Sequence, residues 1–167
     1  MKNIVRHLFS FFAPIVMCFV LPFFITLFER RLLVNPVVTP SISLFIFGLI
    51  IIVVGLILLI MTIRMFIFIG SGTIMPWDPT KKLIVLRPYN HVRNPMILGI
   101  IIIQIGEAIS FASYGIVLLA ALNFVINTIY FIYSEEPGLE KRFGEEYIQY
   151  KKNVPRWIPR LKPWQPT

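Results

Sequence analysis

Long uncharged stretches dominate the chain and alternate with short polar segments. Residues 8–28 contain no charged side chain and are followed directly by Glu29, Arg30 and Arg31. A helix over this run would be about 31 Å long at about 1.5 Å per residue, enough to cross a hydrocarbon core of about 30 Å. The charged triplet does not resemble the small-residue site that ends a signal peptide. Residues 42–69 form a second apolar run, interrupted only by Arg64. We therefore predict membrane-spanning helices over 8–28 and 42–69.

The next apolar stretch is too long for one crossing. Residues 94–134 contain a single charge, Glu107, and as one helix they would reach about 61 Å, twice the thickness of the core. Ser110, Ser113 and Gly115 cluster where a turn is needed. We predict a hairpin with spans over 95–109 and 114–134, and hence an all-α integral membrane protein of four transmembrane helices, in one domain over 1–167.

Composition supports this class. Hydrophobic residues make up 57% of the 167 positions, charged residues 14%, and the mean hydropathy is +0.79. Soluble domains carry about 25% charged residues. The single cysteine, Cys18, also excludes an internal disulfide.

The net charge of +8 is explained by membrane orientation. Of the lysines and arginines outside the predicted spans, only Arg30 and Arg31 fall on the side opposite the N-terminus. The positive-inside rule then places both termini in the cytoplasm. Because the basic residues are spread over several segments rather than clustered on one face, we do not expect nucleic acid as a partner.

Most polar information lies in two predicted cytoplasmic segments, 70–94 and 135–167. Prolines at 76, 79, 88 and 95 predict that the first is a chain of turns around one extended run, 82–86. In the second, four apolar or aromatic side chains recur at helical spacing among charges, which predicts an amphipathic helix at the membrane interface; they are Leu139, Phe143, Tyr147 and Tyr150.

Polar residues mark one face of the fourth predicted span. Asn123, Asn127, Tyr130 and Ser134 share that face, which leads to Glu135 and Glu136. Lipid cannot satisfy such groups, so the face either lines a pocket or hydrogen-bonds to a neighbouring helix. Acidic residues at a helix C-terminus oppose the helix dipole, so we expect a cation nearby.

The predicted third span raises two further points. Glu107, with Gln104 one turn before it, is a candidate proton carrier, because it is a carboxylate within a predicted membrane span. The hairpin, however, places it near the far interface, where a carboxylate stays hydrated. Pairs of glycines seven residues apart predict close helix packing: Gly48 with Gly55, and Gly99 with Gly106.

An ordered set of short motifs over roughly residues 65–160 resembles the isoprenylcysteine carboxyl methyltransferase family, which is related to the phospholipid methyltransferases. The set comprises Gly70-Ser71-Gly72-Thr73, Leu83-Ile84-Val85 with Tyr89, Arg93-Asn94-Pro95-Met96 with Gly99, Glu135-Glu136, Phe143-Gly144 with Tyr147 and Tyr150, and Val154-Pro155-Arg156. Asn94 and Ile97 replace a histidine and a tyrosine of the family pattern. Phe131 stands where the eukaryotic prenylcysteine enzymes carry an arginine.

The resemblance implies a membrane enzyme that uses S-adenosylmethionine, with no metal. Arg93 and Glu136 are the implied catalytic residues. The implied cofactor-binding residues are Gly70, Gly72, Lys82, Leu83, Ile84, Tyr89, His91, Arg93, Asn94, Pro95, Met96, Asn127, Glu135 and Glu136. Their chemistry suits the cofactor, since carboxylates bind its ammonium or ribose hydroxyls, an arginine its carboxylate, and a tyrosine its adenosine. His91 is expected either in the site or at the interface.

A lipophilic or prenylated acceptor is expected, because an acyl or prenyl chain can enter a site at the membrane boundary laterally from the bilayer. Phospholipid N-methylation is the nearest alternative; a membrane reductase and a non-catalytic membrane subunit stay open, as does the oligomeric state. The expected location is a prokaryotic inner or cytoplasmic membrane. Arg156, Trp157 and Trp164 are expected to anchor the tail at the lipid headgroups, with a catalytic role for Arg156 left open.

Overall fold

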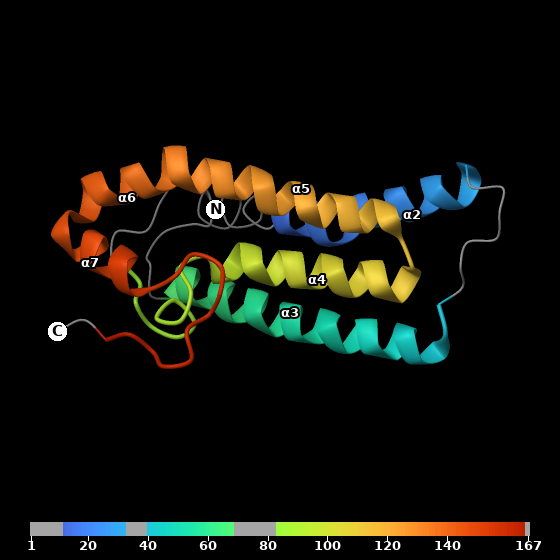
Figure 1. Cartoon of the computed structure of the whole chain (residues 1–167), viewed down its shortest axis with the longest axis horizontal. Helices are drawn as coiled ribbons and strands as arrows, with labels where there is room; N and C mark the ends of the chain where they lie inside the picture. Colours follow the sequence, from blue (N-terminus) through green and yellow to red (C-terminus); the bar gives the residue numbers. More distant parts are fainter. Residues whose placement is uncertain (1–11, 33–39, 69–82, 166–167) are drawn as a thin grey trace, which may run out of the picture. The chain divides into compact units, whose positions relative to one another are not determined.

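The computed structural model describes residues 12–32, 40–68 and 83–165, and every regular element among them is a helix (Figure 1). In chain order these are η1 (Val16–Val20), α2 (Leu21–Leu32), α3 (Ile42–Phe68), α4 (Pro95–Phe111), α5 (Tyr114–Tyr130), η2 (Phe131–Glu135), α6 (Glu136–Phe143) and α7 (Glu145–Asn153). η1 and η2 are π-helical turns continuous with the α-helices that follow them. The predicted all-α class is confirmed.

Within the described ranges, three helical stretches are long and apolar enough to cross a membrane: Phe12–Leu32, Ile42–Met65 and Tyr114–Phe143. The fourth apolar helix, α4, has 17 residues and a length of about 25 Å. The first helix continues past the predicted end at Phe28 to Leu32, because Glu29 finds partners inside the protein. The third stretch would be about 45 Å long, so its charged end, from Glu135 onward, lies beyond the hydrocarbon core.

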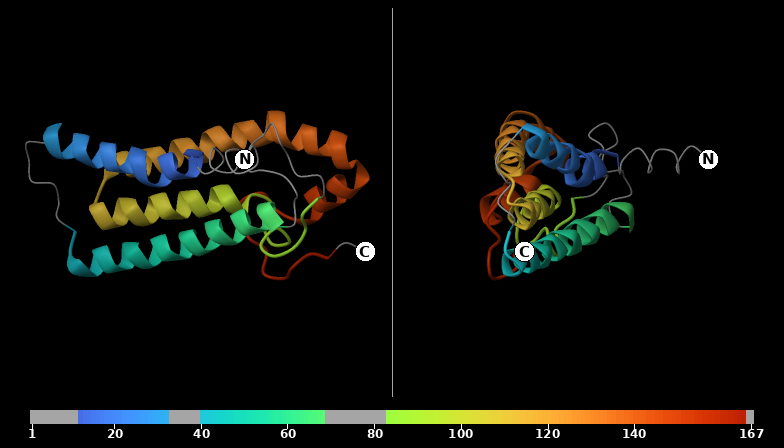
Figure 2. Two further views of the ribbon diagram at one scale, coloured as in Figure 1. Left: turned by 180° about the vertical axis from the view of Figure 1, so that it is seen from behind. Right: turned by 90° about the vertical axis from the view of Figure 1, so that its right-hand side faces the viewer.

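The chain divides into two compact units, Met1–Ile57 with Gly99–Phe124, and Leu58–Leu98 with Val125–Thr167. In the first unit, α3 and α4 lie side by side (Figures 1 and 2). A Cβ atom on Gly48 would lie 2.5 Å from the carbonyl oxygen of Gly106, and one on Gly55 would lie 2.8 Å from that of Gly99. The predicted glycine pairing is confirmed: these helices touch through their backbones.

The predicted hairpin turn is also confirmed. α4 ends at Phe111, Ala112 adopts a left-handed φ of 49°, and α5 begins at Tyr114. The carboxylate of Glu29 on α2 accepts hydrogen bonds from the Ser113 hydroxyl at 2.5 Å and from the Gly115 backbone N–H at 2.6 Å. An acidic side chain from another helix therefore caps the N-terminus of α5.

Buried polar side chains link three helices of the first unit. The Gln104 amide donates to the Met17 carbonyl oxygen at 3.1 Å and accepts from the Asn123 amide at 3.2 Å. Glu107 is only 7% exposed, and its Oε2 has no hydrogen-bond partner in the described part of the chain. The expectation that Glu107 stays hydrated was therefore wrong. For Asn123, the helix-contact interpretation of the polar face is confirmed.

In the second unit, the C-terminal region folds back on itself. The helix expected over 139–150 consists of α6 and α7, separated by Gly144 with a φ of +57°. The bend buries Tyr147, Tyr150 and Val154 against partly buried apolar side chains that include Leu83, Val85, Leu139, Phe143 and Trp164. The apolar face predicted to lie on the membrane interface is thus packed against other parts of this unit.

Candidate functional site

The segment from Leu83 to Asn94 forms one wall of a polar cluster in the second unit. Leu83–Val85 has no regular secondary structure, Leu86 is a bend, and residues 87–91 form a turn that includes a cis Arg87–Pro88 peptide. Tyr89 is buried, and its carbonyl oxygen accepts a hydrogen bond of 2.8 Å from the Tyr150 hydroxyl on α7. Burial raises the pKa of the Tyr89 phenol well above 10.0, so it stays neutral at physiological pH.

Backbone hydrogen bonds attach the C-terminal tail to this segment. Three N–H···O bonds, each 2.9 Å, run from Arg93 to Pro155, from Arg160 to His91, and from Trp164 to Asn90. The His91 ring adds a fourth contact, with Nδ1 2.7 Å from the Arg160 carbonyl oxygen. His91 therefore positions the tail. The loop and tail, distant in sequence, form one local framework.

Four charged side chains from the loop, α6, α7 and the tail form an ion cluster in this unit. Glu136, at the start of α6, accepts from Arg93 Nη1 at 2.9 Å and from Arg156 Nε at 2.7 Å, both at Oε1, and pairs with Lys151 Nζ at 3.0 Å through Oε2. The Glu136 side chain is 5% exposed and that of Arg93 is 9% exposed. The sequence predicts a cation near the acidic pair, and the structure has three: Arg93 from the loop, Lys151 from α7 and Arg156 from the tail.

The cations decide the protonation state of Glu136. Burial alone would raise the pKa of its carboxyl, but hydrogen bonds from Arg156 and Lys151 and the charge of Arg93 outweigh burial and leave the pKa below 4.5. Glu136 is therefore ionised at neutral pH. Because both of its oxygens are already engaged, it suits the orientation of Arg93 and Arg156 better than proton transfer.

Glu135 has the opposite environment. It ends the π-helical turn η2, and such turns are frequent at functional sites because the extra residue re-aims the side chains that follow. Burial raises its carboxyl pKa to about 7, with a further contribution from the charge of Glu136 and a smaller opposing one from Arg142. Among the described residues, no ion pair within 4 Å engages Glu135, so its carboxyl is available to a ligand.

Two further polar atoms of the second unit are buried and lack a hydrogen-bond partner among the described residues. Arg93 Nε and Asn90 Oδ1 have no hydrogen-bond partner in the described ranges. Buried polar atoms are nearly always paired in native proteins, so each needs an explanation. A buried donor and a buried acceptor without partners, in the same unit as the unpaired Glu135 carboxyl, fit a ligand with a carboxylate, N–H or O–H groups and a cation.

The predicted site residues fall into three groups. Those gathered in the second unit around the loop and η2 are Leu83, Ile84, Tyr89, His91, Arg93, Asn94, Pro95, Met96, Glu135 and Glu136. Asn94 and Pro95 occupy the N-cap and first positions of α4, which both residue types favour. Asn127 lies on α5 in the same unit, partly buried. Gly70, Gly72 and Lys82 lie outside the described residues.

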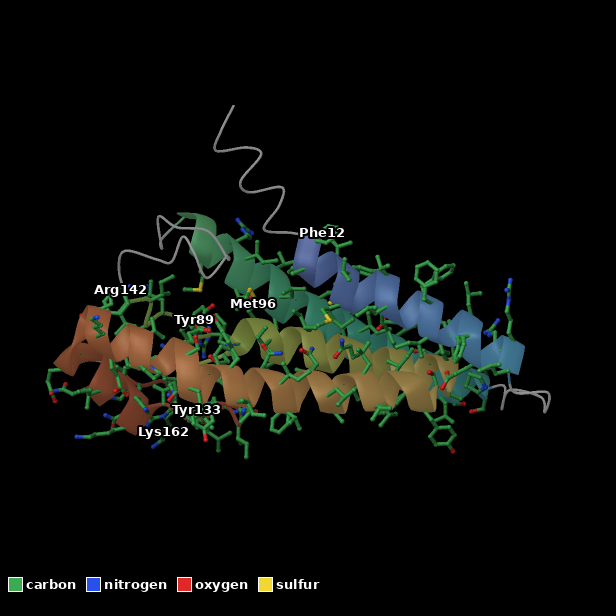
Figure 3. All side chains as sticks on the ribbon, turned by 90° about the horizontal axis from the view of Figure 1, so that it is seen from above. Phe12, Tyr89, Met96, Tyr133, Arg142 and Lys162 are labelled. Atoms are coloured by element: carbon green, nitrogen blue, oxygen red, sulfur yellow. The ribbon has the colours of Figure 1, made fainter. Side chains whose placement is uncertain are left out.

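Figure 3 separates the two sides of the long helix that continues from α5 into α6. Tyr89 and Tyr133 are drawn on opposite sides of it, and Tyr133 is 79% exposed whereas Tyr89 is 8% exposed. The charge of Glu135 contributes to the raised pKa of Tyr89, which links this carboxyl to the Tyr89 side of the helix.

Sequence reasoning missed Lys151 and left Arg156 undecided. Both reach Glu136 only because Gly144 turns α7 back toward α6 and the tail follows it. A glycine directly after Phe143, the last residue of α6, was the available signal for that bend. Trp157 and Trp164, expected to anchor in headgroups, instead pack on Phe131 and Tyr150, with ring centroids 5.8 and 5.9 Å apart.

The model of one protein family, described as phospholipid methyltransferase, matches residues 43–146. The match covers more than half of the chain and includes Arg93, Glu135 and Glu136. No curated protein and no solved structure matches the chain significantly. The chain belongs to the phospholipid methyltransferase family, and it is an integral membrane protein of the methyltransferase class.

Proposed function

We propose that this member of the phospholipid methyltransferase family transfers a methyl group from S-adenosylmethionine to a lipophilic acceptor at the membrane boundary. The observation that carries the proposal is a set of groups in the second unit that have no partner among the described residues: the Glu135 carboxyl, Arg93 Nε and Asn90 Oδ1. The cofactor supplies an electrophilic methyl group on a sulfonium cation. Its ammonium, carboxylate and hydroxyls match an acid, a guanidinium and an amide oxygen.

Each residue has a specific role in the proposal. Glu135, once ionised, neutralises a cationic group of the cofactor, and Arg93 Nε donates to its carboxylate. Glu136 holds Arg93 and Arg156 in place and is a positioning residue. Charge-assisted hydrogen bonds of this kind contribute about 1.5–3 kcal/mol each when water is excluded. Alignment of nucleophile, methyl and sulfur supplies most of the acceleration of an in-line transfer.

Two acceptor classes follow from different observations. The motifs of the loop, the acidic pair and the tail resemble those of the isoprenylcysteine carboxyl methyltransferases, which supports a prenylated carboxylate as the first choice. A carboxylate acceptor is already a nucleophile and needs no base. The family match favours the second, a phospholipid amine, which must lose a proton before it attacks. Glu135 is then the candidate base, because its raised pKa lies close to neutrality.

The orientation of the protein is part of the proposal. The positive-inside rule supports placing the site and both termini in the cytoplasm, where S-adenosylmethionine is made. The acceptor then enters from the bilayer and the cofactor from the aqueous side.

A labelled-methyl assay tests the proposal. Purified protein in lipid nanodiscs receives methyl-labelled S-adenosylmethionine with a prenylcysteine, phosphatidylethanolamine or a short-chain water-soluble analogue of each. We expect label in one lipophilic acceptor and much less in its soluble analogue. Label in none of them contradicts the function. Equal label in a soluble analogue contradicts the membrane-side entry of the acceptor.

Matched variants identify the site. Glu135→Gln removes the free carboxylate and should abolish transfer, whereas Glu140→Gln changes a partly exposed acid on α6 and should leave transfer intact. NADPH in place of S-adenosylmethionine tests the reductase alternative in the same preparation.

A further inference from the structure

Two apolar side chains of the C-terminal tail are strongly exposed. Ile158 is 80% exposed and Leu161 is 98% exposed, the largest exposure recorded for a hydrophobic side chain in the described residues. They alternate with cations in the sequence Ile158-Pro159-Arg160-Leu161-Lys162. Apolar side chains interleaved with lysine and arginine are typical of segments that lie in the lipid interface.

The beginning of the tail contacts the ends of two apolar helices. The Arg93 N–H donates to the Pro155 carbonyl oxygen, and Arg93 lies two residues before α4 begins. The Trp157 ring packs on Phe131, which lies in the last turn of the apolar part of the long helix. Two independent contacts thus place the beginning of the tail level with the ends of two apolar helices. Figure 1 shows the tail, in red, close to the start of α4.

The tail is also held rigidly. Arg160 donates its backbone N–H to His91 and its guanidinium Nη1 to the Asn153 carbonyl oxygen at 2.8 Å, and Trp164 closes the loop at Asn90. The tryptophans that would ordinarily mark an interface are packed inward. Within this hydrogen-bonded framework, the side chains of Ile158 and Leu161 stay exposed.

We propose that residues 158–162 form a membrane-docking loop, in which Ile158 and Leu161 enter the interfacial region of the bilayer and Lys162 pairs with anionic lipid phosphate. Burial of apolar side chains at the acyl boundary and attraction of lysine to a negative surface act together in such loops. The loop fixes the tail, and through Arg156 the ion cluster at Glu136, at a constant depth. The proposal stands independently of the proposed reaction.

Single-site labelling tests the loop. In a Cys18→Ser background, Ile158→Cys and Leu161→Cys carry an environment-sensitive fluorophore, with Glu146→Cys on α7 as the exposed control. Each is reconstituted in nanodiscs of mixed phosphatidylcholine and phosphatidylglycerol. We expect shallow lipid-borne nitroxides to quench the labels at 158 and 161 and aqueous iodide to quench the label at 146.

Iodide quenching at 158 and 161 equal to that at 146 overturns the proposal. A third label at Lys162→Cys, in the same loop, replaces the lysine that pairs with lipid phosphate. Its lipid quenching should therefore be weaker than at 158 and 161 but stronger than at 146. Thermal unfolding of each labelled protein verifies the fold. All four sites are exposed, so retained unfolding temperatures are expected.

Discussion

Arg93 and Glu136, 43 positions apart in the sequence, form an ion pair of 2.9 Å in which both side chains are almost completely buried. The pair joins the loop before α4 to the start of α6, and Arg156 and Lys151 complete it. Removing one partner from such a cluster leaves uncompensated charge in a dry environment. The stability and the geometry of the site therefore depend on the same carboxylate.

Glu136→Ala should reduce the free energy of unfolding by about 3–5 kcal/mol, because Arg93 and Arg156 lose their buried counterion. Glu140→Ala is the control. It removes only a pair of 2.7 Å with Lys151 in which both side chains are 38% exposed, and such pairs contribute at most about 1 kcal/mol. Thermal and denaturant unfolding in detergent measure both. Similar losses for the two variants would show that the cluster at Glu136 is not a buried one.

Glu135 predicts a pH dependence that can be measured without any ligand. Its carboxyl pKa is about 7 in the folded protein against an ordinary 4.5, so the folded state prefers the protonated form. That contribution is fully present below 4.5 and is lost as the pH rises through about 7. Wild type should lose stability relative to Glu135→Gln between about pH 5 and pH 8. Parallel stability curves over that range would contradict the burial of this carboxyl.

Two glycine substitutions should act in opposite directions. Gly48→Ala places a methyl group against Ser110 and the Gly106 backbone, so α3 and α4 must separate, at a cost of about 1–3 kcal/mol. A Cβ on Gly138 in α6 has nothing within 4 Å, so Gly138→Ala should stabilise by about 0.5–1 kcal/mol through helix propensity. Unfolding of the two variants in one detergent gives the comparison. Destabilisation by Gly138→Ala would mean that α6 is tightly covered.

The buried polar residues of the first unit have separable roles. Gln104→Leu removes hydrogen bonds to Met17 and Asn123 and should cost about 1 kcal/mol, given that such bonds in membranes average about 0.6 kcal/mol each. Glu107→Gln keeps the shape and should leave stability and methyl transfer unchanged, because Glu107 Oε2 is unpaired among the described residues. Loss of methyl transfer in Glu107→Gln, with stability unchanged, would instead support a proton-carrying role for Glu107.

The fold was largely predictable because bilayer thickness limits helix length. Uncharged runs gave the helices, Ser113 and Gly115 marked the hairpin, and the glycine spacing gave the contact between α3 and α4. The end of the first helix was less predictable. In the sequence, Glu29 indicates the end of the apolar span, and only the fold shows that its carboxylate is bound by Ser113 and Gly115.

The site was predictable only in part. Local motifs identified Arg93, Glu135 and Glu136, but not which acid is engaged, because that depends on where α7 and the tail return. The inward packing of Trp157 and Trp164 was unpredictable for the same reason. Tryptophan is a residue type that suits a headgroup anchor, and only the fold supplies Phe131 and Tyr150 as alternative partners.

The most direct test is the thermal stability of the detergent-purified protein with and without S-adenosylmethionine. At about a hundredfold excess over its dissociation constant, the cofactor should stabilise the wild type by roughly 2.7 kcal/mol. The effect should weaken as the pH falls below about 7, where Glu135 becomes protonated, and Glu135→Gln should lose it while Glu140→Gln keeps it. No stabilisation of the wild type, or the same stabilisation of Glu135→Gln, would contradict a cofactor site at this cluster.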